Sequence, residues 1–169
     1  PEGERFFISS VRKYRDQITD PKLIEDVKNF IRQESQHGIV HSKLIEDLRK
    51  QGMPVQEFID FQKEAFRYSL EKFSPKFNIA VTAAAEHVTA LLTEVFFSNN
   101  QILKNVDPNI RAMLAWHAIE EMEHKAVAFD VMQKVAKVDH ATRIKALMFI
   151  GTAMPTFTLI RANAMLKHD

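Results

Sequence analysis

Three residues in the second half of the chain have types and spacing that suit metal chemistry. His117, Glu121 and His124 stand at positions i, i+4 and i+7, so on a helix all three side chains project from one face. Other positions of the same phase are apolar: Ile110, Leu114, Ala128, Val131 and Val135. A buried carboxylate is costly unless it is paired or coordinates a metal ion. The pattern therefore predicts a metal site to which other helices must contribute ligands.

The spacing Glu-x-x-His occurs twice, and a lone glutamate precedes each copy by about one helix and a turn. At i and i+3 the two side chains of each copy converge beside the helix, which suits a single metal ion. In both halves the glutamates are in phase with apolar residues. The first half contributes Glu4, Glu34 and His37, and the second half contributes Glu86, Glu121 and His124. The repeated order predicts two pseudo-equivalent halves.

The same donor set occurs in helical bundles that hold two iron or manganese ions. Four carboxylates neutralise two divalent cations, and the chain has no cysteine, which excludes thiolate sites, iron–sulfur clusters, disulfides and cysteine nucleophiles. Nitrogen and oxygen ligands favour iron, with manganese or zinc as the alternatives. We predict two metal ions. The competing interpretations are a layer of polar core residues that form hydrogen bonds with one another, and a chance occurrence of the pattern. The predicted ligands are Glu4, Glu34, His37, Glu86, His117, Glu121 and His124.

Four neighbouring residues have less certain roles. Glu2 competes with Glu4, but only Glu4 is in phase with the apolar positions that follow. Glu120 reaches His124 at i+4, although its phase points it partly away, so Glu121 is preferred. His41 follows His37 by one turn and stays open as a further ligand, as a residue that orients a ligand carboxylate, or as neither. His87 points about 100° away from Glu86 and reads as a surface residue.

Helix start and stop signals divide the chain into six predicted helices and no strand. Aspartate or serine followed by proline marks the starts near residues 21, 75 and 108, and Gly52-Met53-Pro54 separates the second and third helices. The expected ranges are 3–18, 21–51, 54–73, 75–98, 108–137 and 139–167. We therefore predict an all-α protein: a four-helix bundle with the third helix as a crossover and an extra C-terminal helix.

Length and composition exclude several classes of protein. The chain has 169 residues, of which 46% are apolar, and a net charge of +1, which gives no electrostatic basis for binding nucleic acid. We expect one domain, 1–169, with a homodimer left open. No signal pattern is present, so we expect a cytoplasmic protein. Residues 146–160 read as a packing helix in preference to an interfacial one, and membrane contact through 142–167 is the less favoured alternative.

The predicted ligands also resemble known families. The order of glutamates and histidines over residues 4–124 resembles the ferritin-like di-iron superfamily, and His117, an extra histidine before the second Glu-x-x-His, is similar to the di-iron arylamine N-oxygenase group. The segments PEGERFF, FIRQESQHGIVH and WHAIEEMEHKAVAFDV resemble a bacterial family of predicted metal-dependent hydrolases. Members of that family are longer, which leaves open a C-terminal part outside this chain.

These observations support three hypotheses for function. The first is a di-iron oxidase or oxygenase that uses O2 and an electron donor on a small apolar organic substrate. The second is a hydrolase in which two metal ions activate water; it is less favoured because no cluster of arginine or lysine is expected near the ligands to hold an anionic substrate. The third is a metal-binding module without catalytic activity.

Overall fold

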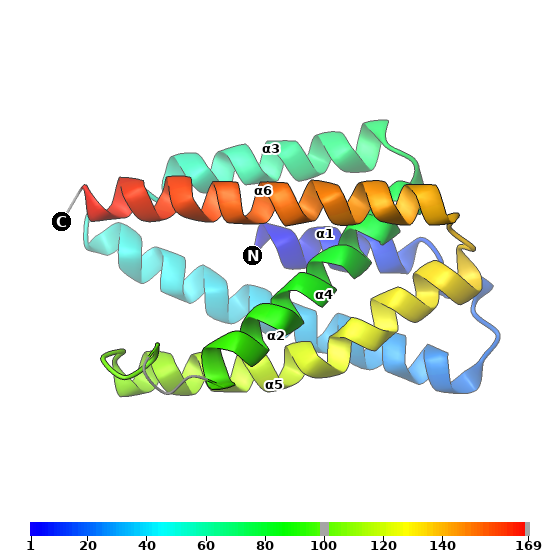
Figure 1. Cartoon of the computed structure of the whole chain (residues 1–169), viewed down its shortest axis with the longest axis horizontal. Helices are drawn as coiled ribbons and strands as arrows, with labels where there is room; N and C mark the ends of the chain where they lie inside the picture. The colour runs from blue at the N-terminus through cyan, green and yellow to red at the C-terminus, as the bar shows by residue number, and fades with distance from the viewer. Residues whose placement is uncertain (99–101, 168–169) are drawn as a thin grey trace.

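A computed structural model describes residues 1–98 and 102–167, and within these ranges the protein consists of helices joined by loops, with no strand (Figure 1). This confirms the predicted all-α bundle. The elements in chain order are α1 (Glu2–Arg12), a 3₁₀ turn (Arg15–Gln17), α2 (Pro21–Lys50), α3 (Gln56–Lys72), α4 (Pro75–Ser98), α5 (Pro108–Asp130), a π-helical turn (Val131–Val135) and α6 (His140–Leu166).

Side-chain caps begin the helices where the sequence predicts them. Asp20 accepts a hydrogen bond from the backbone N–H of Lys22, and Asp107 accepts one from that of Asn109, in both cases across a proline at the first helical position. Asp139 caps α6 in the same way without a proline. Gly52 ends the second helix region with a positive φ of 83°, a conformation that favours glycine. Local chemistry therefore fixes most boundaries.

The first helix, α1, is shorter than the predicted range 3–18 and ends at Arg12. Asp20 precedes a proline, which disfavours the helical conformation, and its backbone is extended. The chain must also reverse direction between α1 and α2. The tight turn Arg15–Gln17 and the extended Ile18 make this reversal while Tyr14 and Ile18 stay buried.

The predicted helix 108–137 is regular only to Asp130. Beyond that point the backbone widens into a π-helical turn, in which the N–H of Ala136 bonds to the carbonyl of Val131. Val131 and Met132 are neighbours in sequence and both are buried, and the wider turn lets both side chains face the core. Lys137, with a φ of 48°, then ends the segment.

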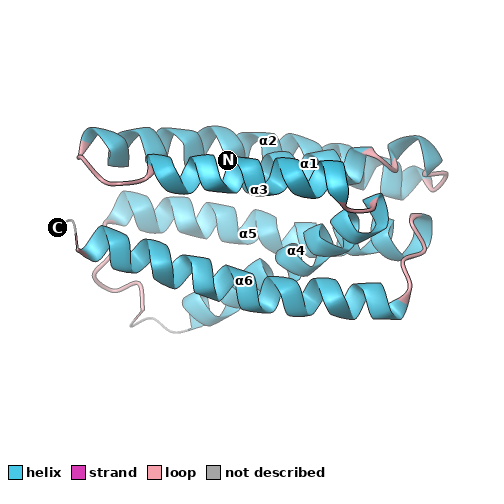
Figure 2. Cartoon of the chain, turned by 90° about the horizontal axis from the view of Figure 1, so that it is seen from above, coloured by secondary structure: helices cyan, strands magenta, loops and turns pink. Residues whose placement is uncertain are grey.

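The six helices form two layers of three (Figure 2). In one layer α1 packs between α2 and α3, and in the other α4 packs between α5 and α6. Across the layers α1 packs on α4 and α2 packs on α5. The helices α1, α2, α5 and α4 thus close a ring, and they are the four that carry the predicted ligands. Since α3 flanks the first pair as α6 flanks the second, the two halves correspond helix by helix.

The helix α6 covers α4 but keeps a broad apolar face exposed. Its exposed residues include Leu147, Met148, Phe149, Leu159 and Ile160. Both α4 and α6 are long enough and apolar enough to cross a membrane. In α4, however, half of the apolar segment is buried inside the bundle, whereas in α6 only 11% of the apolar segment is buried. The exposed histidine His87 on α4 agrees with its predicted place at the surface.

Candidate metal centre

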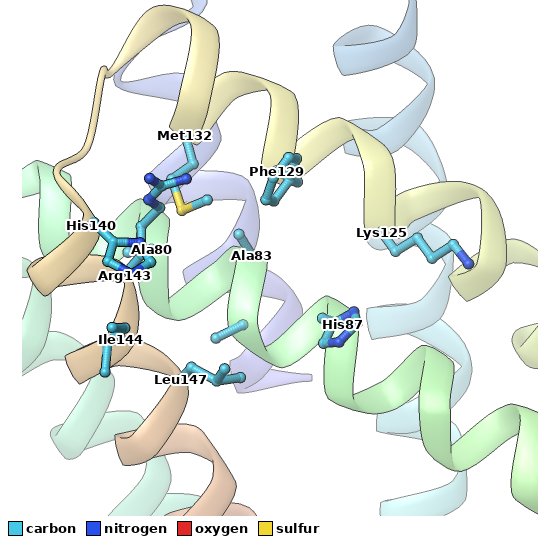
Figure 3. Close-up of a pocket in the computed structure, with 11 residues that line it drawn as sticks. Ala80, Ala83, His87, Lys125, Phe129, Met132, His140, Arg143, Ile144 and Leu147 are labelled. Carbon is cyan, nitrogen blue, oxygen red and sulfur yellow. The ribbon is translucent and has the colours of Figure 1, made fainter.

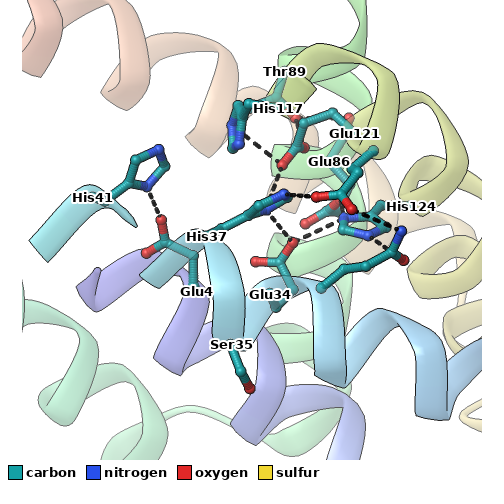
Figure 4. Close-up of polar contacts among 12 residues, drawn as sticks. Glu4, Glu34, Ser35, His37, His41, Glu86, Thr89, His117, Glu121 and His124 are labelled. Atoms are coloured by element: carbon teal, nitrogen blue, oxygen red, sulfur yellow. Dashed lines mark hydrogen bonds and ion pairs between the residues drawn. The ribbon is translucent and has the colours of Figure 1, made fainter. Parts of the chain in front are cut away.

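Four predicted ligands meet in the middle of the bundle, where each has an atom within 4.8 Å of an atom of every other one. They are Glu34 and His37 of α2 and Glu121 and His124 of α5, and all four are buried (Figure 4). The Oε1 atom of Glu34 lies 2.8 Å from Nδ1 of His124 and 3.2 Å from Nδ1 of His37. The two Glu-x-x-His pairs, which are 87 positions apart in sequence, therefore face one another across the layers. This cluster could hold metal ions.

Glu86 of α4 lies beside the cluster and is fully buried. Neither of its carboxylate oxygens has a hydrogen-bond partner, and Oε2 is 3.8 Å from Nδ1 of His124. Burial raises the pKa of Glu86 well above its usual value, and the nearby charges of Glu121 and Glu34 raise it further. A buried carboxylate among other carboxylates lacks a counter-charge, which a cation would supply.

The histidines of the cluster each have one ring nitrogen occupied and one directed inward. Nε2 of His37 donates to Glu120 at 2.8 Å, and Nε2 of His124 donates to the amide oxygen of Gln33 at 3.1 Å. The Nδ1 atoms of both rings face Glu34 but have no partner in hydrogen-bond geometry. Metal-bound histidines commonly donate their second N–H to such an acceptor, which fixes the tautomer and the ring orientation. The donor set thus fits a metal ion.

Two residues that sequence reasoning did not include connect this arrangement. Gln33 donates through its amide nitrogen to Glu120 at 3.3 Å, so it links the acceptors of the two histidine rings. Thr89, one turn after the buried glutamate of α4, donates to Oε2 of Glu121 at 2.9 Å. Glu120 itself contacts His37 of the other layer, although its sequence position predicted contact with His124. The sequence favoured Glu121 over Glu120 as the residue that faces the core, and Glu121 is the one that lies in the buried cluster.

The predicted ligands Glu4 and His117 lie at one side of the buried cluster. Glu4 of α1 accepts a hydrogen bond from His41, and His117 approaches Glu121 with Nε2 at 3.4 Å from Oε1. The ring centroids of His117 and His37 are 4.3 Å apart. Glu2 turns instead to Arg5, with 2.6 Å between the charged groups. All seven predicted ligands therefore lie at or beside one centre, and their roles as ligands remain predictions.

The electrostatic environments of Glu4 and His117 differ. Burial alone would raise the pKa of Glu4, but the hydrogen bond from His41 and nearby positive charge outweigh it and lower that pKa to about 2. Burial lowers the pKa of His117 to about 4, and the neighbouring His37 and His41 add to this effect. At neutral pH this side of the centre thus offers a carboxylate and an unprotonated imidazole, which are the forms that bind metal ions.

A cavity of about 330 Å³ opens onto this side of the centre. Its polar wall includes Glu34, Glu121 and His117, and its apolar wall comes from Phe7 of α1, Leu44 and Ile45 of α2 and Ile59 of α3. The sequence predicted an apolar pocket, and this cavity combines an apolar wall with a polar one. A second cavity of about 370 Å³, between α4, α5 and α6, contains none of the clustered residues (Figure 3).

One cationic residue reaches the cavity beside the centre, which sequence reasoning did not anticipate. Arg161 of α6 lies in its lining, and the Nε atom of this side chain is buried without a hydrogen-bond partner. Burial lowers the pKa of the guanidinium group, which nevertheless stays charged. Arg161 lies near the end of α6, the helix after the one that carries the last predicted ligand, and neither a motif nor helix phase indicated this proximity.

Comparison with known proteins supports an enzyme family built around a metal site. A family model described as "predicted metal-dependent hydrolase" matches residues 1–169. Comparisons with curated proteins and with solved structures found no match. The family description agrees with the buried cluster of two glutamates and two histidines. The chain belongs to the family of predicted metal-dependent hydrolases.

Proposed function

We propose that this protein is a dinuclear-metal oxidase or oxygenase that acts on a small, largely apolar organic molecule. The observation that carries the proposal is the pair of histidine rings whose Nε2 atoms donate to Glu120 and Gln33 while their Nδ1 atoms face buried carboxylates. Four carboxylates without a thiolate suit iron. Two iron ions held there would supply the redox chemistry for activating O2, with an external electron donor.

The chain's own groups would define the coordination geometry. The Oε1 atom of Glu34 lies near the inward-facing nitrogens of both histidines, so Glu34 would hold metal together with His37 and His124. Thr89 binds the outer oxygen of Glu121 and leaves its Oε1 atom directed towards His37 and His117. His41 holds Glu4 in the same manner on the cavity side. Such contacts restrict carboxylate rotation and set ligand basicity.

The cavity supports an organic substrate. Its apolar wall lies on the side of the centre that carries His117 and Glu4, and it offers contact area to an aliphatic or aromatic group. Binding of such a group would displace water from this side of the centre, where water would otherwise compete with the substrate for a reactive oxidant.

Hydrolysis is the second candidate, and the family description favours it. In that case the centre would lower the pKa of a bound water, and the cavity would hold an ester, amide or phosphoryl substrate. Both functions require the same ligands, so they are separated by reactivity and not by metal content.

The test compares two loaded forms of one preparation. Metal-free protein is loaded with Fe(II) under anaerobic conditions, O2 is admitted, and its consumption is followed with an oxygen electrode and by absorption spectroscopy; zinc-loaded protein serves as the control. We expect rapid O2 consumption by the iron form alone, and its loss in Glu121→Ala. Inert iron protein together with esterase or phosphodiesterase activity of the zinc or manganese form would contradict the oxidase proposal and support hydrolysis.

A further inference from the structure

The cavity beside the centre contains a positive charge that none of the ion pairs in the described part of the chain uses. Arg161 approaches from α6, whereas the predicted ligands come from α1, α2, α4 and α5. Arg161 shares the cavity with three carboxylates, yet these contact histidines and Thr89 instead. Its Nε atom is shielded from water and unpaired. An unpaired buried donor of a charged group is costly unless something else binds it.

Charge balance indicates the sign of the missing partner. If two divalent ions occupy the centre, four glutamates neutralise them and the imidazoles stay neutral, so the loaded site with Arg161 carries one positive charge. A guanidinium group binds a carboxylate through two parallel hydrogen bonds, and this geometry favours planar oxyanions. One wall of the cavity is apolar and is formed by Phe7, Leu44, Ile45 and Ile59.

We propose that Arg161 binds the carboxylate of a monoanionic organic acid whose apolar body occupies the cavity beside the centre. This inference rests on the proposed function and names its substrate class: a fatty or aryl carboxylic acid. The carboxylate pairs with Arg161 at the α6 side, and the aliphatic or aromatic part lies against α1, α2 and α3. Arg161 then acts by positioning the acid relative to the predicted metal ligands.

The chain offers a matched control for Arg161. Arg143 lies on the same helix, also has a buried Nε atom without a partner, and lines the cavity between α4, α5 and α6, which contains none of the clustered residues. Replacing either arginine with methionine removes one charge from α6 and keeps a long side chain. An effect specific to Arg161→Met therefore reports on the cavity beside the centre and not on the net charge of the helix.

The experiment measures binding of octanoate and of the uncharged octanamide to zinc-loaded protein by isothermal titration calorimetry. Wild type should bind octanoate more tightly than octanamide. Arg161→Met should weaken octanoate binding by about tenfold or more, the usual scale for losing a hydrogen bond to a charged group, and leave octanamide and the zinc stoichiometry unchanged. Arg161→Lys should retain part of the preference, and Arg143→Met should match wild type.

Three results would overturn the inference. Equal octanoate affinity in wild type and Arg161→Met would show that the carboxylate binds elsewhere, and a loss confined to Arg143→Met would place it in the other cavity. A parallel loss of octanoate, octanamide and zinc in Arg161→Met would show that the arginine only balances the ligand carboxylates. If zinc binds normally but octanoate binding does not depend on Arg161, this inference alone is contradicted. If wild type binds no zinc, the proposed function is contradicted as well.

Discussion

At the scale of single residues, the centre depends on side chains that hold the predicted ligands as much as on the ligands themselves. His37 donates to Glu120 and His124 donates to Gln33. Gln33 joins the two hydrogen bonds, because its amide carries an acceptor for His124 and a donor for Glu120. An amide can do this, whereas an ionised carboxylate could only accept. The geometry of both rings thus depends on one glutamine.

Replacing Gln33 with methionine should therefore weaken metal binding without removing a ligand. Loss of a group that orients a metal-bound histidine costs roughly 10–100-fold in affinity. Gln36→Met, an exposed position on the same helix, is the control and should have no effect. Zinc affinities measured by competition with a chelator give the result, and equal affinities of the two variants would show that Gln33 does not support the centre.

Glu86 predicts how the stability of the metal-free protein depends on pH. Its pKa is raised in the folded protein, by burial first and then by Glu121 and Glu34. Between the ordinary pKa of glutamate and the raised pKa of the folded state, Glu86 is ionised in the unfolded chain but keeps its proton in the folded protein. The free energy of unfolding should therefore fall as pH rises through this interval. The loss is about 1.4 kcal/mol per pH unit over that interval.

Glu86→Gln removes the titrating group and should make the metal-free protein more stable at pH 8 than wild type, with a flatter profile from pH 5 upward. Urea unfolding at several pH values measures both quantities. Glu94→Gln, an exposed residue on the same helix, should keep the slope of wild type. A slope in Glu86→Gln as steep as that of wild type would refute the role given to Glu86.

At the scale of the elements, capping chemistry and helical phase explain what could be predicted. Asp20-Pro21 and Asp107-Pro108 fixed the starts of α2 and α5, the helices with the Glu-x-x-His pairs. The phase of Glu34, Glu121 and their histidines predicted that these side chains lie inside. The early end of α1 and the π-helical turn after α5 were missed. The first depends on the chain reversal between α1 and α2, and the second on the packing of Val131 and Met132 in the core.

The contacts between helices set the limit of prediction from this sequence. The helical phase of the apolar residues shows which face of a helix is buried. It does not show which other helix packs against that face, or which residues of the two helices lie at the same level. For this reason Glu120 was expected near His124 and lies against His37, and Arg161 was not expected near the centre at all. No local pattern around Arg161 distinguishes it from Arg143 on the same helix.

Gly38 offers a test of helix packing between α1 and α2. A Cβ atom added at this position would meet the Cβ atom of Glu4 at 4.0 Å, which is an ordinary contact. The nearness of the two helices agrees with the close approach that a glycine allows, but it leaves room for a methyl group. Gly38→Ala should therefore raise the free energy of unfolding by about 0.5–1 kcal/mol through helix propensity.

Urea unfolding of Gly38→Ala measures this gain, with Gly151→Ala as the comparison because nothing lies within 4 Å of its added Cβ atom. Both variants should be stabilised by similar amounts. A destabilised Gly38→Ala beside a stabilised Gly151→Ala would mean that α1 lies closer to α2 than the structure shows.

At the scale of the whole molecule, the centre joins two layers that otherwise meet through α1 with α4 and α2 with α5. The four clustered residues come equally from the two layers, so a bound ion would crosslink them. In the absence of metal the same interface contains unpaired carboxylate oxygens and ring nitrogens. The metal-free bundle should therefore be weakest at its centre.

Removing the metal should lower the melting temperature and increase amide hydrogen exchange in α2 and α5 more than in α3. At a free metal concentration a thousand times the dissociation constant, binding adds about 4 kcal/mol, which corresponds to roughly 10 °C for a chain of this size. Calorimetry and hydrogen exchange of the two forms test this directly. Identical melting temperatures, or changes limited to α3, would contradict the proposed crosslink between layers.

The central claim, that one centre of glutamates and histidines holds two metal ions, is tested most directly by an anaerobic titration of Fe(II) into metal-free protein. Elemental analysis of the washed samples gives the stoichiometry. We predict an end point of two ions per chain for wild type and less than two for Glu121→Ala, whose side chain lies within the buried cluster. An end point of two ions in Glu121→Ala, or no binding to wild type, would contradict the account.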